Sequence, residues 1–219
     1  MIDKIVYFDL GTAYNGNELK TMLDHVFPTL KLRYECHCFE GNKENYEKVK
    51  ERFARYHRVY FYNLIISESE GKKKLFYADN PSGHSIYQSK KNVGDEYEIG
   101  ISIRFSKWLK NQWPGRINLT DTSTLNILRY NIEGAELDLF RDLDKEDLFK
   151  LFKIIRGSSG NDILKCSEIA DKITEFQDIC RKNNIPLEHK WSWKEPEKMI
   201  QWILLSIEPD GFEPYKEQL

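Results

Sequence analysis

Several features that would define a protein class are missing from this sequence. Its 219 residues contain no apolar run long enough to cross a membrane. The formal net charge is only −2, which gives no overall attraction to nucleic acid or to an anionic membrane. The first residues resemble a strand and not a signal peptide. We therefore expect a globular cytoplasmic protein without a nucleic-acid or membrane partner.

Cysteine is also scarce. The four cysteines form neither a pair of CxxC motifs nor a disulfide framework, so the sequence indicates no metal site. Cys36 and Cys38 alternate along a predicted strand and share one of its faces. We expect buried free thiols, as is usual in a reducing compartment.

The residues that are present suit one folded domain, residues 1–219. Hydrophobic residues make up 40%, charged residues 31% and aromatic residues 13%, which is enough apolar material for a sizeable core. Two short lysine runs, at 72–74 and 90–91, are predicted to be solvated. There is no internal repeat and no low-complexity linker.

Strand patterns alternate with helix patterns along the chain. We expect strands at 4–11, 33–41, 58–67, 124–134 and 185–193, with short ones within 67–79 and 101–114. We expect helices at 16–30, 42–56, 135–143, 145–155, 169–184 and 195–207, and one within 101–114. Residues 80–98 are polar and predict a long, mobile loop. The alternation predicts a doubly wound α/β fold with a mostly parallel sheet and helices on both faces.

Polar residues follow four of the predicted strands. They are Asp9, Glu40, Asn63, and the pair Asn131 and Glu133. Ligands of doubly wound folds bind at the carboxyl ends of the strands. These side chains therefore predict a binding site at one edge of the sheet.

The loop after the first strand, GTAYNG, offers glycines where a backbone can approach a ligand. It lacks the full G-x-G-x-x-G pattern of a pyrophosphate site, and Asp9 stands beside it. A cationic ligand suits this loop better than a dinucleotide. Glu40 lies where a carboxylate would hold a ribose diol.

Four segments together resemble the FkbM-type methyltransferases. They are VYFDLGTAYNG, CFEGNKENYEKVKERF, NLIISESEGKKKLFYADNPSGHSIYQSKK and LRYNIEGAELDLFRDL, of which the Ile-Glu-Gly-Ala-Glu stretch is the most specific. The resemblance covers residues 4–142 and leaves 143–219 as a divergent C-terminal part. It implies a Rossmann-like methyltransferase fold and S-adenosylmethionine as cofactor. It also implies O-methylation of a sugar or another small metabolite.

The resemblance implies a role for each cofactor-binding position. Asp9, Gly11 and Gly16 would surround the methionine end, Glu40 would hold the ribose, and Asn63 would face the adenine edge.

The same resemblance implies the catalytic positions. Asn131 and Glu133 would lie beside the transferring methyl group, and an alcohol acceptor needs a base. Glu133, His84 and His189 are the candidate bases, whereas Glu136 suits a helix start.

Two other interpretations stay open. Asn131 stands where the family has aspartate, and the loop glycines are spaced more widely, which favours a non-catalytic relative that binds a nucleoside or a protein. A nucleotide-sugar or dinucleotide enzyme on a similar sheet is the other interpretation. Trp191, Trp193 and Trp202 are predicted to pack in the core in preference to forming a sugar platform. The acceptor and the oligomeric state are not predicted.

Overall fold

A parallel five-stranded sheet forms the centre of the protein. The computed structural model describes residues 2–112, 118–158, 160–187 and 192–207. The strand order is β3-β2-β1-β7-β8, and every neighbouring pair is parallel. The strands are β1 (Lys4–Leu10), β2 (Arg33–Phe39), β3 (Val59–Tyr62), β7 (Thr124–Tyr130) and β8 (Ile154–Gly157).

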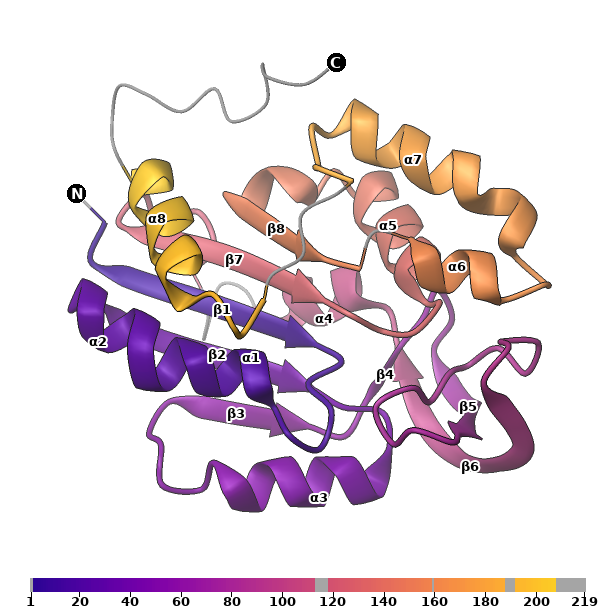
Figure 1. The fold of residues 1–219 in the computed structure, drawn as a ribbon. Helices are drawn as coiled ribbons and strands as arrows, with labels where there is room; N and C mark the ends of the chain where they lie inside the picture. The colour runs from indigo at the N-terminus through magenta and orange to yellow at the C-terminus, as the bar shows by residue number, and fades with distance from the viewer. Residues whose placement is uncertain (1, 113–117, 159, 188–191, 208–219) are drawn as a thin grey trace.

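Helices cover both faces of this sheet, as the sequence predicted (Figure 1). One face packs against α1 (Asn17–Thr21), the π-helical turn η1 (Met22–Val26), α2 (Phe27–Leu30), α3 (Lys43–Arg52) and α8 (Pro196–Ile207). The other face packs against α4 (Phe105–Gln112), α5 (Glu136–Lys145), α6 (Asn161–Lys165) and α7 (Ile173–Lys182).

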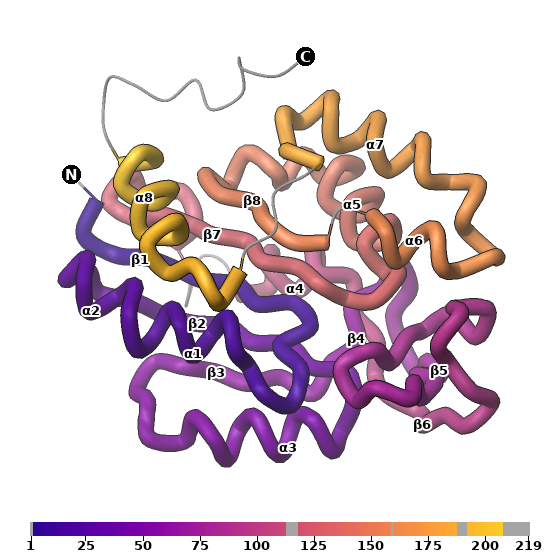
Figure 2. The backbone as a smooth tube through the Cα atoms, viewed as in Figure 1, coloured from indigo at the N-terminus to yellow at the C-terminus, as the bar shows by residue number. Residues whose placement is uncertain are grey.

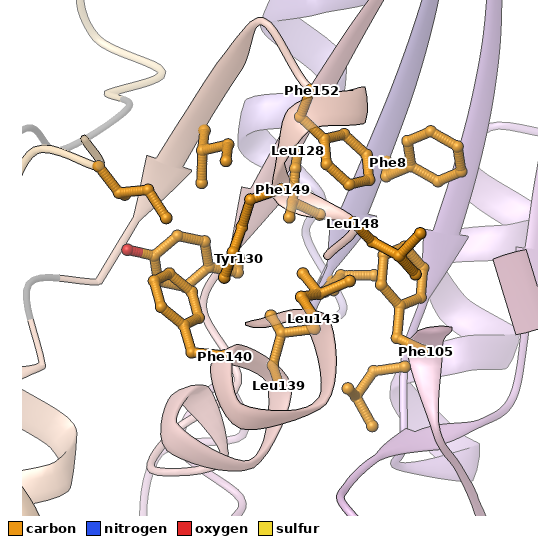
Figure 3. Packing of buried hydrophobic residues seen from close by; sticks show 14 of the residues in the cluster. Phe8, Phe105, Leu128, Tyr130, Leu139, Phe140, Leu143, Leu148, Phe149 and Phe152 are labelled. Carbon is orange, nitrogen blue, oxygen red and sulfur yellow. The ribbon is translucent and has the colours of Figure 1, made fainter. Parts of the chain in front are cut away.

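Alternation along the strands creates the two cores. In β1, Ile5 and Tyr7 belong to the first cluster, whereas Val6 and Phe8 belong to the second. Figure 3 shows the second cluster, in which Phe8 joins rings and aliphatic side chains from β7, α4 and α5. All four cysteines are buried and free, which confirms the prediction of buried thiols.

A second, smaller sheet lies beyond the carboxyl ends of β1 and β2 (Figures 1 and 2). It contains β4 (Ile65–Ile66), β5 (Gly71–Ala78) and β6 (Val93–Ile103), in the order β4-β6-β5. The predicted loop at 80–98 is therefore too long, because β6 begins at Val93. The sequence did not indicate this strand because about half of its positions face solvent, and many of those are charged residues or glycine. The predicted strand at 58–67 is two strands, β3 and β4, which belong to different sheets.

The C-terminal part adds to the main sheet. Residues 145–155 were predicted as a helix, but they form the end of α5, the 3-10 turn η2 (Phe149–Leu151) and the start of β8. Apart from the partly buried Leu151, their apolar residues are all buried, so the spacing of apolar residues did not distinguish helix from strand. Residues 169–184, predicted as one helix, hold the 3-10 turn η3 (Ala170–Lys172) and α7.

Two further segments differ in detail from the prediction. The helix predicted at 16–30 ends at Leu30 as expected, but it is divided into α1, η1 and α2. The π-helical turn η1 precedes Pro28, which has no N–H to donate to the previous turn. Neither Ile185–Leu187 nor Ser192–Trp193 forms a strand, and residues 188–191, including His189 and Trp191, lie outside the described residues.

Candidate functional site

A small cavity, partly open to solvent, lies at the carboxyl edge of the main sheet. The chain leaves β1 for β2 on one side and later returns to β7 on the other, so strand order reverses at β1. The cavity at this edge has a volume of about 60 Å³. Among the predicted site residues, its lining includes Gly11, Glu40, His84, Asn131 and Glu133. The fold thus brings together residues that are up to 122 positions apart in the sequence, from Gly11 to Glu133.

Gly11 closes the loop after β1 tightly against β7. Its φ is +84°, and a Cβ there would lie 2.0 Å from the backbone oxygen of Asn131. Both features require glycine. Gly16 does not line the cavity; a Cβ there would meet the ring of Phe53, the residue after α3, at 2.7 Å. The two glycines therefore permit close packing of protein on protein.

Asp9 lies beneath this loop and is not among the residues that line the cavity. Its Oδ1 accepts a hydrogen bond from Nη1 of Arg129 at 2.9 Å, and the same nitrogen donates to the Gly11 oxygen at 2.6 Å. Burial raises the pKa of Asp9 to about 6, although Arg129 opposes the shift. Asp9 thus supports the loop through Arg129, a residue that the sequence analysis did not single out.

Glu40 holds the loop after β1 to the start of α3. Its Oε2 accepts from the Ala13 amide at 2.8 Å, and its Oε1 accepts from the Asn42 amide at 2.9 Å. Burial raises the pKa of Glu40 to about 7. Each carboxylate oxygen has a second lone pair, so Glu40 can also accept hydrogen bonds from a ligand in the cavity.

The side chain of Asn63 is bound to the backbone at the end of β2. Its Nδ2 donates to the backbone oxygens of Glu40 and Gly41, both at 3.0 Å. Asn63 does not line the cavity. It fixes the end of β2 relative to β3.

Glu133 lies just beyond β7 with an unusual backbone. Its φ is +57°, a conformation that non-glycine residues seldom adopt. Nδ2 of Asn131 contacts its Oε1 at 3.4 Å, and Lys90 forms an ion pair with its Oε2. Burial and Asp162 raise the pKa of Glu133, and Lys90 opposes them.

Lys90 comes from the connection between β5 and β6, residues 79–92, which forms the roof of the cavity. Its side chain is fully buried, and Nζ also donates to the Gly83 oxygen at 2.9 Å. Oγ of Ser85, in the same connection, donates to the Glu133 oxygen at 2.7 Å. The sequence analysis expected Lys90 to be solvated, and that expectation is wrong. A lysine in a polar loop carries no sequence signal for burial.

His84 lines both the cavity and an open groove beside α3. Its Nδ1 accepts from the Ala78 amide at 3.0 Å. Burial lowers the pKa of His84, with a smaller contribution from Lys90. Neutral His84 therefore carries its proton on Nε2, where it can donate a hydrogen bond.

Glu136 is wholly buried and turns back over the chain that precedes α5. Its two oxygens accept from the amides of Ile132 at 3.0 Å and Gly134 at 2.7 Å. Burial raises the pKa of Glu136 to about 7, with a further contribution from Asp162. The structural role predicted for Glu136 agrees with these contacts.

Within the described residues, no group of His, Cys, Asp and Glu side chains is arranged to hold a metal ion. No helix in the described ranges combines the length and apolar character needed to cross a membrane.

Comparisons of the chain with protein families, with curated proteins and with solved structures gave no match. The site is therefore interpreted from its own geometry.

Proposed function

We propose that the protein binds S-adenosylmethionine at the carboxyl edge of its main sheet and methylates a hydroxyl group of a small molecule such as a saccharide. The observation that carries this proposal is the position of Glu40. It ends β2 beside the point where strand order reverses, and it lines one cavity with Gly11 and Asn131. A buried carboxylate at this place suits a ribose diol.

The residues of the cavity divide into two chemical groups. Glu40 and the backbone near Gly11 would hold the cofactor, which supplies an electrophilic methyl group and leaves as S-adenosylhomocysteine. Asn131 and Glu133 would face the acceptor, whose oxygen loses a proton as it attacks. Glu133 would take that proton, and the Nε2–H of His84 would orient the acceptor by donating a hydrogen bond.

Binding requires the roof to move. Sites for ligands of drug size have volumes of roughly 300–1,000 Å³. The cavity of about 60 Å³ is far smaller. Residues 79–92 would have to swing away from Glu133 to admit the cofactor, which breaks the contacts of Ser85 and Lys90 with that residue. Residues 79–92 would thus act as a lid, in keeping with the mobile loop predicted for 80–98.

The small cavity and the Glu133–Lys90 ion pair favour a second candidate. In that case the protein is a methyltransferase-like binding protein without activity. Lys90 would stay paired with the Glu133 carboxylate, which catalysis would need as a base. Asn131, which is no base near neutral pH, agrees with this candidate.

A thermal-shift experiment tests the first candidate. S-adenosylhomocysteine at a hundredfold excess over Kd should stabilise the protein by about 2.7 kcal/mol, and NAD should not. Methyl transfer to a panel of saccharides then separates the two candidates. Binding without transfer supports the inactive binder. Absence of any stabilisation by S-adenosylhomocysteine contradicts the proposal.

A further inference from the structure

The outer face of the small sheet carries an exposed apolar row. Tyr97, Ile99 and Ile101 alternate along β6, and their exposed fractions are 44%, 55% and 50%. They are the only three consecutive same-face positions among the large exposed hydrophobic residues of the described chain. Each face of the main sheet is covered by helices, whereas this row remains open to solvent.

Two lysines flank this row on the neighbouring strand. Lys72 pairs with Ile101 in register and Lys74 pairs with Ile99, so both cations are on the same face as the apolar row. Both are exposed. In the part of the chain that the structure describes, neither forms an ion pair, and Lys74 lies 4.0 Å from the centre of the Tyr97 ring. The third lysine of the run, Lys73, faces inward and donates to Ser67.

We infer that this face binds an acidic amphipathic helix of a partner protein. Along a strand, alternate residues are about 6.6 Å apart. On a helix, apolar residues at i and i+4 are about 6 Å apart along the axis. One helical stripe can therefore contact Ile99, Ile101 and Tyr97 in turn.

The charges determine which helix fits. Neighbouring strands are about 4.8 Å apart, so the lysines lie to one side of the apolar row. Carboxylates that flank the stripe of the bound helix would reach Lys72 and Lys74. Burial of the apolar row would give the complex affinity, and the ion pairs between the two lysines and the carboxylates of the helix would fix its orientation.

A flat anionic membrane fits this surface less well. Asp95 is exposed on β6, two residues before Tyr97. A planar surface that touches the whole strand would bring its negative charges close to this carboxylate. A helix is narrow enough to contact the row and the lysines only.

A peptide-binding experiment tests this inference without involving the cavity. The probe is a fluorescein-labelled helical peptide of about 18 residues, with leucines in one stripe and glutamates on its flanks. Fluorescence anisotropy should give a dissociation constant in the micromolar range, weakened at high salt. The double variant Lys72→Glu/Lys74→Glu should weaken binding at least tenfold, and so should Ile99→Thr/Ile101→Thr.

Matched controls make the result specific. The variant Lys145→Glu/Lys153→Glu changes two other exposed lysines on a different part of the protein, neither of which forms an ion pair with a described residue, and its binding should equal the wild type. Replacing every glutamate of the peptide by lysine should abolish binding. No binding by the acidic peptide overturns the inference, and so does equal binding by all variants. Lysine-dependent binding to phosphatidylserine vesicles without peptide binding overturns it in favour of a membrane. All variants should keep the wild-type response to S-adenosylhomocysteine, so this test is independent of the proposed function.

Discussion

Lys90 and Glu133 form a buried ion pair that joins the roof of the cavity to the end of β7. Glu133 was expected from the sequence as a site residue, and Lys90 was not. The pair brings residues 43 positions apart into direct contact. It makes the same carboxylate both a candidate base and the anchor of the roof.

Removal of Lys90 should destabilise the protein. Lys90→Met leaves the Glu133 carboxylate, whose side chain is only 16% exposed, without its cation, so the free energy of unfolding should fall by at most about 3–5 kcal/mol. Urea denaturation measures it. Lys91→Met, at the exposed neighbour, should stay within about 0.5 kcal/mol of the wild type. In Lys90→Met/Glu133→Gln no unpaired charge remains, and much of the loss should be recovered. An additive double variant would show that the two residues do not interact.

Gly11→Ala should be far more disruptive than a comparable change at Gly71. Both glycines have positive φ, at +84° and +116°. A Cβ at Gly11 would collide with the Asn131 oxygen, whereas a Cβ at Gly71 has no heavy atom within 4 Å. Gly71→Ala should cost about 1–2 kcal/mol for the backbone alone. Gly11→Ala should cost clearly more, measured by thermal unfolding. Equal losses would mean that the contact between Gly11 and Asn131 is not tight.

At a pH above 7, where Glu40 is ionised, Glu40→Gln should weaken the binding of S-adenosylhomocysteine by about 1.5–3 kcal/mol, because it replaces a charged acceptor by a neutral one. Isothermal titration calorimetry measures this change. Glu98→Gln is the control, since Glu98 also accepts from Asn42 and lies outside the cavity lining. Unchanged affinity in Glu40→Gln removes Glu40 from the ligand site.

Glu133→Gln should lower the rate of methyl transfer by about 10²–10⁴-fold, which is the usual contribution of a general base. Cofactor affinity should change little. Asn131→Asp should be tolerated and should raise activity if a second carboxylate assists. Single-turnover kinetics with an accepted substrate measures both variants. A normal rate in Glu133→Gln assigns this residue to anchoring the roof only.

The protein should lose stability as the pH rises from about 5 to about 7. The folded protein raises the pKa of Glu40 and Glu136 to about 7 and that of Asp9 to about 6. Glu40 and Glu136 are then mostly protonated in the folded state and ionised in the unfolded state up to about pH 7, and Asp9 up to about pH 6. The slope is about 1.4 kcal/mol per pH unit for each proton. Glu136→Gln should reduce this slope in urea titrations at successive pH values, whereas Glu44→Gln, at a solvent-exposed carboxyl, should leave it unchanged. A parallel pH dependence in Glu136→Gln and wild type contradicts this assignment.

Much of the fold could be read from local patterns. The strands β1, β2 and β7 and the helices α3, α5 and α8 carry clear periods, and their alternation predicted a parallel sheet covered on both faces. The strand ends also indicated one edge as the site. Glu40, Asn131 and Glu133 do line one cavity there, because parallel strands bring their carboxyl ends together.

Other features depend on contacts that no local pattern records. The strand β8 is stabilised by pairing with the edge of β7, and β6 is stabilised by pairing with β5. Three interactions each require a partner that is distant in sequence. They are the ion pair of the buried Lys90, the hydrogen bond between Arg129 and Asp9, and the hydrogen bonds from Asn63 to the end of β2. Periodicity and capping arise from neighbours along the chain, and these determined the layers of this protein. The electrostatic partners of a buried charge arise from packing, and only the tertiary structure decided them.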